Sequence, residues 1–341
     1  MPNNESSCII NSEINKVINN RVESLDALKC LAIFFVVWGH SIQYLNSTNC
    51  VDEPVYRIIY SFHMPLFMMI SGYFAVGSMR MNFCSVFFKK VRQILLPCFA
   101  WITIVWICLA LLDVIKGEQI QFIKLYWGYK NQFWFLKSLF FCYLLAYFAN
   151  KNKMMFVVTV ILSQCMSYSF VNMMFPAFVT GMYLRNLDVE KSVIYKLRYI
   201  LLALFCVMLC FFDQRFWNID LISSKVVFYG NIYYVMLYCY KMLVGLLGAI
   251  SIMMIFLVDF KNIDFPKFIT RCGSMTLGIY ILQSYILERF IGRTIKFDMD
   301  SALFIPFVSV LVSILVIIIS VFIINLLYRS RFLNLILLGM K

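Results

Sequence analysis

The sequence predicts an all-α fold, a polytopic transmembrane helical bundle of about ten spans with both termini in the cytoplasm. Of the 341 residues, 62% are hydrophobic and only 14% are charged, a composition unlike that of soluble domains. Several windows, such as 302–328, are apolar for longer than the ~20 residues that a membrane crossing needs. No segment shows the period-two alternation of an outer-membrane barrel, so we expect the spans to be helices.

Ten apolar stretches follow a polar, Asn-rich beginning that lacks the basic start, apolar core and cleavage site of a signal peptide. We expect residues 1–27 to form a cytoplasmic tail and residues 28–341 to form one transmembrane domain, because the connections are short and show no repeat or linker. The predicted spans are 28–46, 57–77, 94–112, 132–149, 154–169, 171–185, 199–212, 231–259, 273–291 and 303–327.

The net charge of +13 follows this topology. Most Lys and Arg residues lie in the tail and in the even-numbered connections, whereas the acidic residues are shared almost equally between the two sides. By the positive-inside rule, the side that carries Arg92, Arg185 and Arg271 is the cytoplasm. Topology therefore explains the basicity, and no nucleic-acid motif accompanies it. The expected partner is the lipid bilayer and not nucleic acid.

The twelve cysteines are scattered through mostly apolar runs without a C-x-x-C pair, so we expect buried small hydrophobic residues rather than disulfides, and no metal. The long outer connections 113–131 and 213–230 mix aromatic and charged residues, among them Trp127 and Trp217. These aromatic residues form either an interfacial belt or a rim on which sugars stack.

The first span, DALKCLAIFFVVWGH, begins with charged residues and ends on a histidine. Lys29 and His40 are eleven residues apart, close to three helical turns, so both side chains lie on one face and are separated by roughly 16 Å. Asp26 stands three residues before Lys29 and is expected to pair with it. His40 then lies in the outer half of the bilayer.

The second span carries His63 in SFHMPLFMMISGYF, about as far from its outer end as His40 is from its own. The chain has two histidines, and both fall within adjacent antiparallel spans. A single buried histidine is usually a satisfied core residue, but two at one depth indicate a functional pair, because ionisable groups inside membranes are costly. Histidine titrates near neutral pH, which suits a general base or a proton carrier.

The cytoplasmic mouth carries Lys29 and, in FFKKVRQILLP, Lys89, Lys90 and Arg92. These cations form either an ordinary positive-inside anchor or a clamp for the phosphates of a nucleotide. If the cations hold phosphates on the cytoplasmic side, His40 lies roughly 16 Å further out. An extended thioester arm would fill the space between the phosphates and this histidine. Coenzyme A has that shape.

Five segments in this order resemble the acyltransferase-3 family of integral membrane acyltransferases, and most closely its fucose 4-O-acetylase-like branch. They are D-x-L-K-x10-H at 26–40, FHMPLFMMISGYF at 62–74, K-x-x-R at 89–92 before LLP, WFLKSLF at 134–140 and LGIYILQ at 277–283. The resemblance covers essentially the whole chain. It implies an integral protein of a bacterial-type inner membrane.

The resemblance also implies transfer of an acetyl group from cytoplasmic acetyl-CoA to a hydroxyl of a cell-surface or exported carbohydrate. The family's R-x10-H pattern falls on Lys29 and His40, and its R-x-x-R pattern falls on Lys89 and Arg92. In both patterns the first arginine is a lysine here. The charge is kept, but a lysine cannot make the two-point contact that a guanidinium group makes with a phosphate. Gln283 stands where many relatives have histidine, and it cannot act as an acid or base.

We expect His40 to act as the general base, His63 to orient it or stabilise the oxyanion, and Asp26 to position Lys29. A covalent acyl-histidine relay is the variant of this direct transfer. Lys137 and Lys241 are further charges that either line the cavity or, for Lys137, reach toward the interface. The rival interpretations are a proton-coupled transporter or flippase of a polar or lipid-linked substrate, and the same transferase with a succinyl donor. The oligomeric state is left open.

Overall fold

The computed structural model describes residues 4–46, 50, 53–166, 168–187, 193–213, 232–294 and 304–340, with side chains from residue 23 onward except at 194, 195, 304 and 305. Residues 214–231, with Trp217 and nearly all of the second long outer connection, lie outside this range. The first half contains α1 (Asn4–Leu45), α2 (Pro54–Ala75), η2 (Ser78–Arg80), α3 (Phe83–Lys90), the π-helical η3 (Val91–Leu95), α4 (Leu96–Ile115), α5 (Phe122–Asn131), α6 (Trp134–Ala149) and α7 (Lys153–Gln164). The second half contains η4 (Tyr168–Phe170), α8 (Val171–Asn186), α9 (Val193–Lys196), α10 (Arg198–Leu209), α12 (Ile232–Val258), α13 (Lys267–Ser274), α14 (Thr276–Tyr285), the π-helical η6 (Ile286–Ile291), α15 (Gly292–Thr294), α16 (Phe304–Leu327) and α17 (Arg331–Leu338).

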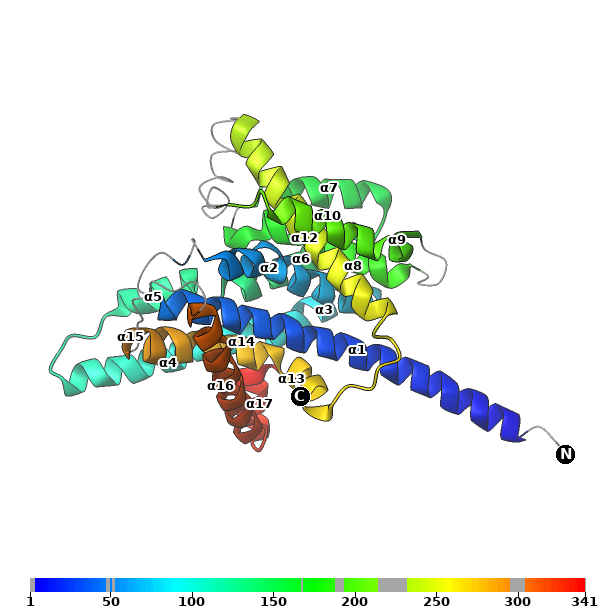
Figure 1. Ribbon diagram of the computed structural model, residues 1–341. Helices are drawn as coiled ribbons and strands as arrows, with labels where there is room; N and C mark the ends of the chain where they lie inside the picture. Colours follow the sequence, from blue (N-terminus) through cyan, green and yellow to red (C-terminus); the bar gives the residue numbers. More distant parts are fainter. Residues whose placement is uncertain are drawn as a thin grey trace.

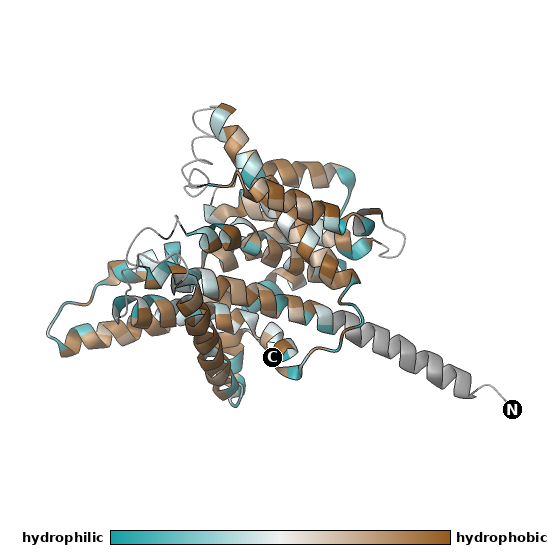
Figure 2. Ribbon diagram, viewed as in Figure 1, coloured by the Kyte–Doolittle hydropathy of each residue, from teal (hydrophilic) through white to brown (hydrophobic). Residues whose placement is uncertain are grey.

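Helix α1 lies between two groups of helices (Figure 1). Helices α2, α8, α10 and α12 pack on one side of it, and α13, α14, α16 and α17 lie on the other. Helices α4, α5 and α15 form one end of the molecule (Figure 1). Hydrophobic residues cover α16 along its length (Figure 2), as expected of a helix that faces lipid. The histidine-bearing helices α1 and α2 are thus surrounded by packed neighbours.

Five helices of the described residues are long and apolar enough to cross a membrane, and α5 with α6, bent by 51°, would make a sixth. The all-α transmembrane class is therefore confirmed. Shorter apolar helices, α7 and α10, occupy the predicted spans 154–169 and 199–212. A helix of 12 residues, such as α7, is about 18 Å long and does not cover the ~30 Å hydrocarbon core. The count of ten spans and the sidedness of the termini stay predictions.

Helices α2 and α8 approach each other closely at two glycines. A Cβ on Gly72 would lie 1.9 Å from the carbonyl oxygen of Phe178, and a Cβ on Gly181 would lie 1.9 Å from that of Met69. Small residues let helix backbones come together in this way inside membranes. The contact holds α2, and with it the second histidine, in a fixed position.

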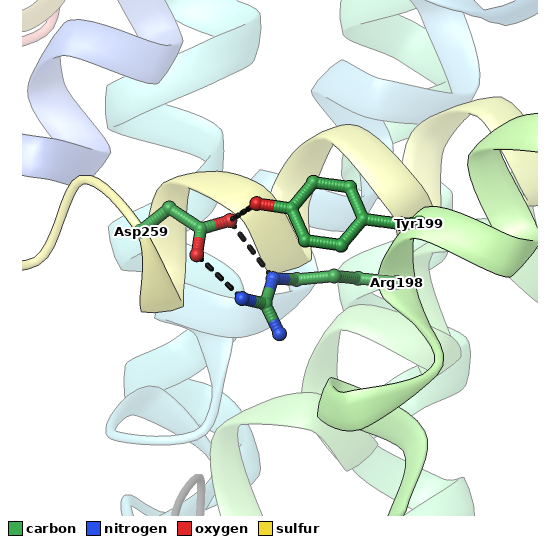
Figure 3. Close-up of polar contacts among 3 residues, drawn as sticks. All are labelled: Arg198, Tyr199 and Asp259. Atoms are coloured by element: carbon green, nitrogen blue, oxygen red, sulfur yellow. Dashed lines mark hydrogen bonds and ion pairs between the residues drawn. The ribbon is translucent and has the colours of Figure 1, made fainter.

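An ion pair joins the start of α10 to the end of α12 (Figure 3). Nε of Arg198 donates to Asp259 Oδ2 at 2.8 Å, and a second guanidinium nitrogen bonds the other carboxylate oxygen. The hydroxyl of Tyr199 donates to the same Oδ2 at 2.9 Å. This two-point contact sets the relative position of the two helices.

Candidate active site

His40 lies near the C-terminal end of α1, and its imidazole meets side chains of α1 and α2. Nδ1 of His40 is 3.3 Å from Oε1 of Gln43 and 3.4 Å from the hydroxyl of Tyr60. Tyr60 donates to the same Oε1 at 3.1 Å. An amide oxygen only accepts hydrogen bonds, so in the tautomer with the proton on Nδ1 the imidazole donates to Gln43. Nε2 then carries the lone pair and is the nitrogen available as a base.

His63 lies within α2 and is 2% exposed. Its Nδ1 lies 2.7 Å from the backbone carbonyl of Ile59, one turn earlier. Since a carbonyl only accepts, this imidazole also carries its proton on Nδ1. In these tautomers both histidines present Nε2 as the unprotonated nitrogen.

Tyr60 lies between the two histidines. Its ring centroid is 4.7 Å from that of His63 and 6.2 Å from that of His40, in edge-to-face arrangements. All three side chains line one cavity of about 260 Å³. The antiparallel spans thus bring both histidines to one cavity, as the sequence predicts. Their catalytic roles stay predictions.

The cavity also contains residues that the sequence motifs point to less directly. Lys241 of α12 lines it, in agreement with the expectation from its place in an apolar span. Trp134 of α6 and Tyr280 of α14 contribute aromatic walls. Sequence analysis singled out neither of these side chains, although both fall inside the segments WFLKSLF and LGIYILQ. Tyr60 could have been found because it stands one turn before His63 on the same face of α2.

Lys137 has a different place. It is 4% exposed, and its Nζ donates to the backbone carbonyls of Tyr129 at 3.1 Å and Lys130 at 2.7 Å. These carbonyls end α5, where the last turn of a helix has no internal donors. Lys137 therefore fixes the bend between α5 and α6. It is not among the residues that line the histidine cavity.

A second, apolar cavity of about 110 Å³ adjoins the first. Met64 and Tyr280 line both cavities and so form the partition between them. Ile33 and Ser71 also line the second cavity. Ile33 is one turn beyond Lys29 on α1, so the two cavities follow α1 from the region of Lys29 to His40.

Asp26 and Lys29 form the predicted ion pair, with 2.8 Å between Oδ1 and Nζ. The ammonium group also lies 4.1 Å from the ring centroid of Phe74, near the end of α2. Because α1 is uninterrupted from Asn4 to Leu45, the rise of roughly 16 Å from Lys29 to His40 holds in the structure.

The three cations before the third predicted span separate into two places. Lys89 and Arg92 line one open cavity of about 550 Å³, and Nε of Arg92 is buried there without a hydrogen-bond partner. Lys90 is 8% exposed and lies outside this cavity, with Nζ 3.7 Å from the ring centroid of Tyr143. The separation follows from helix geometry, since residues i and i+3 share a face whereas i+1 points away.

Gln283 is fully buried in α14, and its Nε2 donates to the carbonyl of Tyr280 at 3.2 Å. Its Oε1 has no hydrogen-bond partner. The side chain does not line the histidine cavity.

Comparisons with known proteins identify a family and two partial relatives. The sequence is similar to the nodulation protein NolL of Sinorhizobium fredii, with 41% identity over 91 residues, which are 26% of this chain and 25% of the relative. It is also similar to the nodulation protein NolL of Mesorhizobium japonicum, with 34% identity over 132 residues, or 37% of this chain and 35% of the relative. The chain thus spans only about a quarter to a third of the length of these curated relatives. No solved structure matches it.

The match to a protein family is far longer. Residues 22–328 match the acyltransferase-3 family, described as an acyltransferase domain. This range includes both histidines and all the basic residues considered above. Together with the apolar helices, the match shows that the protein is an integral membrane member of the acyltransferase-3 family.

Proposed function

We propose that the protein is an O-acetyltransferase that moves an acetyl group from cytoplasmic acetyl-CoA to a hydroxyl of a cell-surface or exported carbohydrate. It would act in a bacterial-type inner membrane and fall in the fucose 4-O-acetylase-like branch of its family. The observation that carries the proposal is the convergence of His40 and His63 on one cavity, each with Nδ1 in contact with an acceptor oxygen.

In the proposed reaction, Nε2 of His40 takes the proton of the acceptor hydroxyl as its oxygen bonds to the acyl carbon. The bond between that carbon and sulfur then breaks, and the departing thiolate receives the proton, so the imidazole returns to its starting state. His63 stabilises the oxyanion or orients His40. A positioned base supplies about 10²- to 10⁴-fold of the rate.

On the donor side, the cations at the inner end fit the phosphates of a nucleotide. Lys89 and Arg92 face one cavity, and their charges would attract an anion there. Asp26 holds Lys29 at the start of the row of cavities that leads to His40. Lys90, stacked on Tyr143, would support this clamp from behind.

The test uses membranes that carry the full chain, acetyl-labelled CoA and a panel of carbohydrate acceptors. Label should pass to an acceptor with the wild-type protein, and His40→Gln should lower the rate by about 10²-fold or more at equal protein abundance. Lys196→Gln, a change of an exposed lysine on α9, serves as the control and should transfer normally. Wild-type transfer by His40→Gln would refute the assignment of the base.

Two further arms separate the rival functions. Succinyl-labelled CoA in place of acetyl-CoA identifies the acyl group. Uptake or flipping of the carbohydrate without any acyl donor, with no transfer in its presence, would instead identify a transporter that uses the histidines as a proton relay.

A further inference from the structure

A separate cavity lies at the end of the molecule formed by α4, α5 and the η6–α15 segment (Figure 1). Its volume is about 530 Å³, within the range of small-molecule sites. It is distinct from the histidine cavity and from the cavity of Lys89 and Arg92. Nothing in the reaction described above uses it.

Four cations and one carboxylate line this cavity: Lys116, Lys124, Arg289, Arg293 and Asp113. The carboxylate is already paired, because Nζ of Lys124 lies 3.5 Å from Oδ2 of Asp113. In the part of the chain that the structure describes, the other three cations form no ion pair. Nε of Arg289 is buried and has no hydrogen-bond partner. The cavity therefore carries an excess of positive charge and an unused donor, which together favour an anion.

Aromatic and apolar side chains complete the walls. Trp106 and Trp127 both line the cavity, and Trp106 is fixed by a hydrogen bond from Nε1 to the carbonyl of Gln121 at 3.2 Å. A tryptophan ring offers a flat apolar face beside a polar edge. The C–H face of a sugar ring packs on such a surface while its charged group remains near the cations. A simple inorganic anion would use only the basic wall.

Residues close to each other in the chain line this cavity and the histidine cavity. Gln132 lines the basic cavity and Trp134 lines the histidine cavity, with Phe133 between them at the bend from α5 to α6. Phe133 is 5% exposed and adopts a left-handed backbone conformation with φ of 52°, which is unusual for a bulky residue. The hydroxyl of Tyr285 donates to Gln132 Oε1 at 3.4 Å. A ligand in the basic cavity would thus contact the segment whose next residues line the histidine cavity.

We propose that this cavity binds the acceptor of the reaction, and that the acceptor is an anionic carbohydrate whose phosphate or carboxylate meets Arg289 and Arg293 while its ring packs on the tryptophans. The inference rests on the proposed acyltransferase function and specifies the substrate class of that function.

Binding is measured on the purified full chain in nanodiscs of zwitterionic lipid, without an acyl donor. The probes are 4-nitrophenyl β-D-glucuronide and its neutral match, 4-nitrophenyl β-D-glucoside. The wild type should bind the glucuronide about tenfold or more tightly than the glucoside, and the difference should shrink at high salt. Arg289→Gln and Arg293→Gln should each remove most of this preference, and Arg289→Lys should restore part of it. Lys196→Gln should leave it unchanged.

Three results in zwitterionic nanodiscs would overturn the inference. They are equal affinity for the two glycosides, a preference that survives both arginine variants, and equally tight binding of 4-nitrophenyl phosphate, which has the anion and no sugar. Nanodiscs that contain phosphatidylglycerol test a lipid headgroup as the occupant, and loss of glucuronide binding in them would also contradict the inference.

His40→Gln separates this inference from the proposed function. It should retain the full preference for glucuronide while losing acyl transfer. If the preference is present but no donor supports transfer, the binding site stands and the acyltransferase proposal fails. If transfer occurs and the preference is absent, the acyltransferase proposal stands and the inferred binding site fails.

Discussion

The hydroxyl of Tyr60 lies 3.4 Å from Nδ1 of His40 and donates to the amide oxygen that the same nitrogen contacts. Tyr60 also packs its ring against His63. It therefore orients both imidazoles without offering a base of its own.

Tyr60→Phe keeps the ring and removes the hydroxyl. We expect acyl transfer to fall about tenfold, mainly in kcat, because His40 loses part of what holds its orientation, while KM for the acyl donor stays within about twofold. Steady-state kinetics with labelled acetyl-CoA checks this expectation. Tyr126→Phe, at an exposed position on α5, is the matched control. An unchanged kcat in Tyr60→Phe would remove the positioning role.

Gly181→Ala places a methyl group where the carbonyl oxygen of Met69 lies 1.9 Å away. Helices α2 and α8 must separate to accept it, which costs about 1–3 kcal/mol or more. We expect a lower unfolding temperature in detergent and a loss of activity in proportion. Gly77→Ala is the control, because a Cβ there meets nothing within 4 Å. Equal unfolding temperatures for the two variants would contradict the close approach.

Lys137→Met removes the donor that satisfies the carbonyls at the end of α5. Because these hydrogen bonds are only partly buried, losing them should cost less than the ~1–3 kcal/mol of a fully buried unpaired carbonyl. We expect reduced thermal stability and easier proteolysis at the bend near Phe133. Lys151→Met, at an exposed position after α6, should change neither measurement. A Lys137→Met protein as stable as the control would show that the capping bonds contribute little.

The hydrogen bond from Arg198 holds the pKa of Asp259 below its ordinary value of 3.8. A carboxyl whose pKa is lower in the folded state stabilises the fold above its unfolded-state pKa, and this contribution is lost as the pH falls through the folded-state pKa. Asp259→Asn should therefore lower the unfolding temperature near pH 7 by about 2 °C or less, since the pair is partly exposed. The difference from wild type should shrink below pH 4. Asp264→Asn, at an exposed site in the same connection, should show no such dependence.

The sequence predicts the pairing of the histidines for a simple reason. Two adjacent antiparallel spans, each with a histidine at a similar distance from the same end, bring those residues to one level, and the structure places both on one cavity. The Asp26–Lys29 pair follows from i, i+3 spacing in the same way. Helical periodicity and the order of the spans are therefore enough to predict both the histidine pair and the ion pair.

The rest of the site depends on distant contacts that periodicity does not encode. Trp134 and Tyr280 reach the cavity from helices far along the chain, and nothing in their own segments specifies which neighbour they meet. The helical repeat could have predicted that Lys90 lies apart from Lys89 and Arg92. Residues i and i+3 share a face of a helix, whereas residue i+1 points in another direction. An apolar run in the sequence is not always a membrane crossing, because some such runs form helices as short as α7.

The shared border of Met64 and Tyr280 has a consequence for the membrane itself. If the acyl group crosses the bilayer as proposed, the protein must still block protons and ions. Two side chains, one of them an unbranched and flexible thioether, line both cavities at their shared border. In the proposed reaction, a thioester arm that reached His40 from the second cavity would have to displace that thioether, and the return of the thioether would separate the two cavities again.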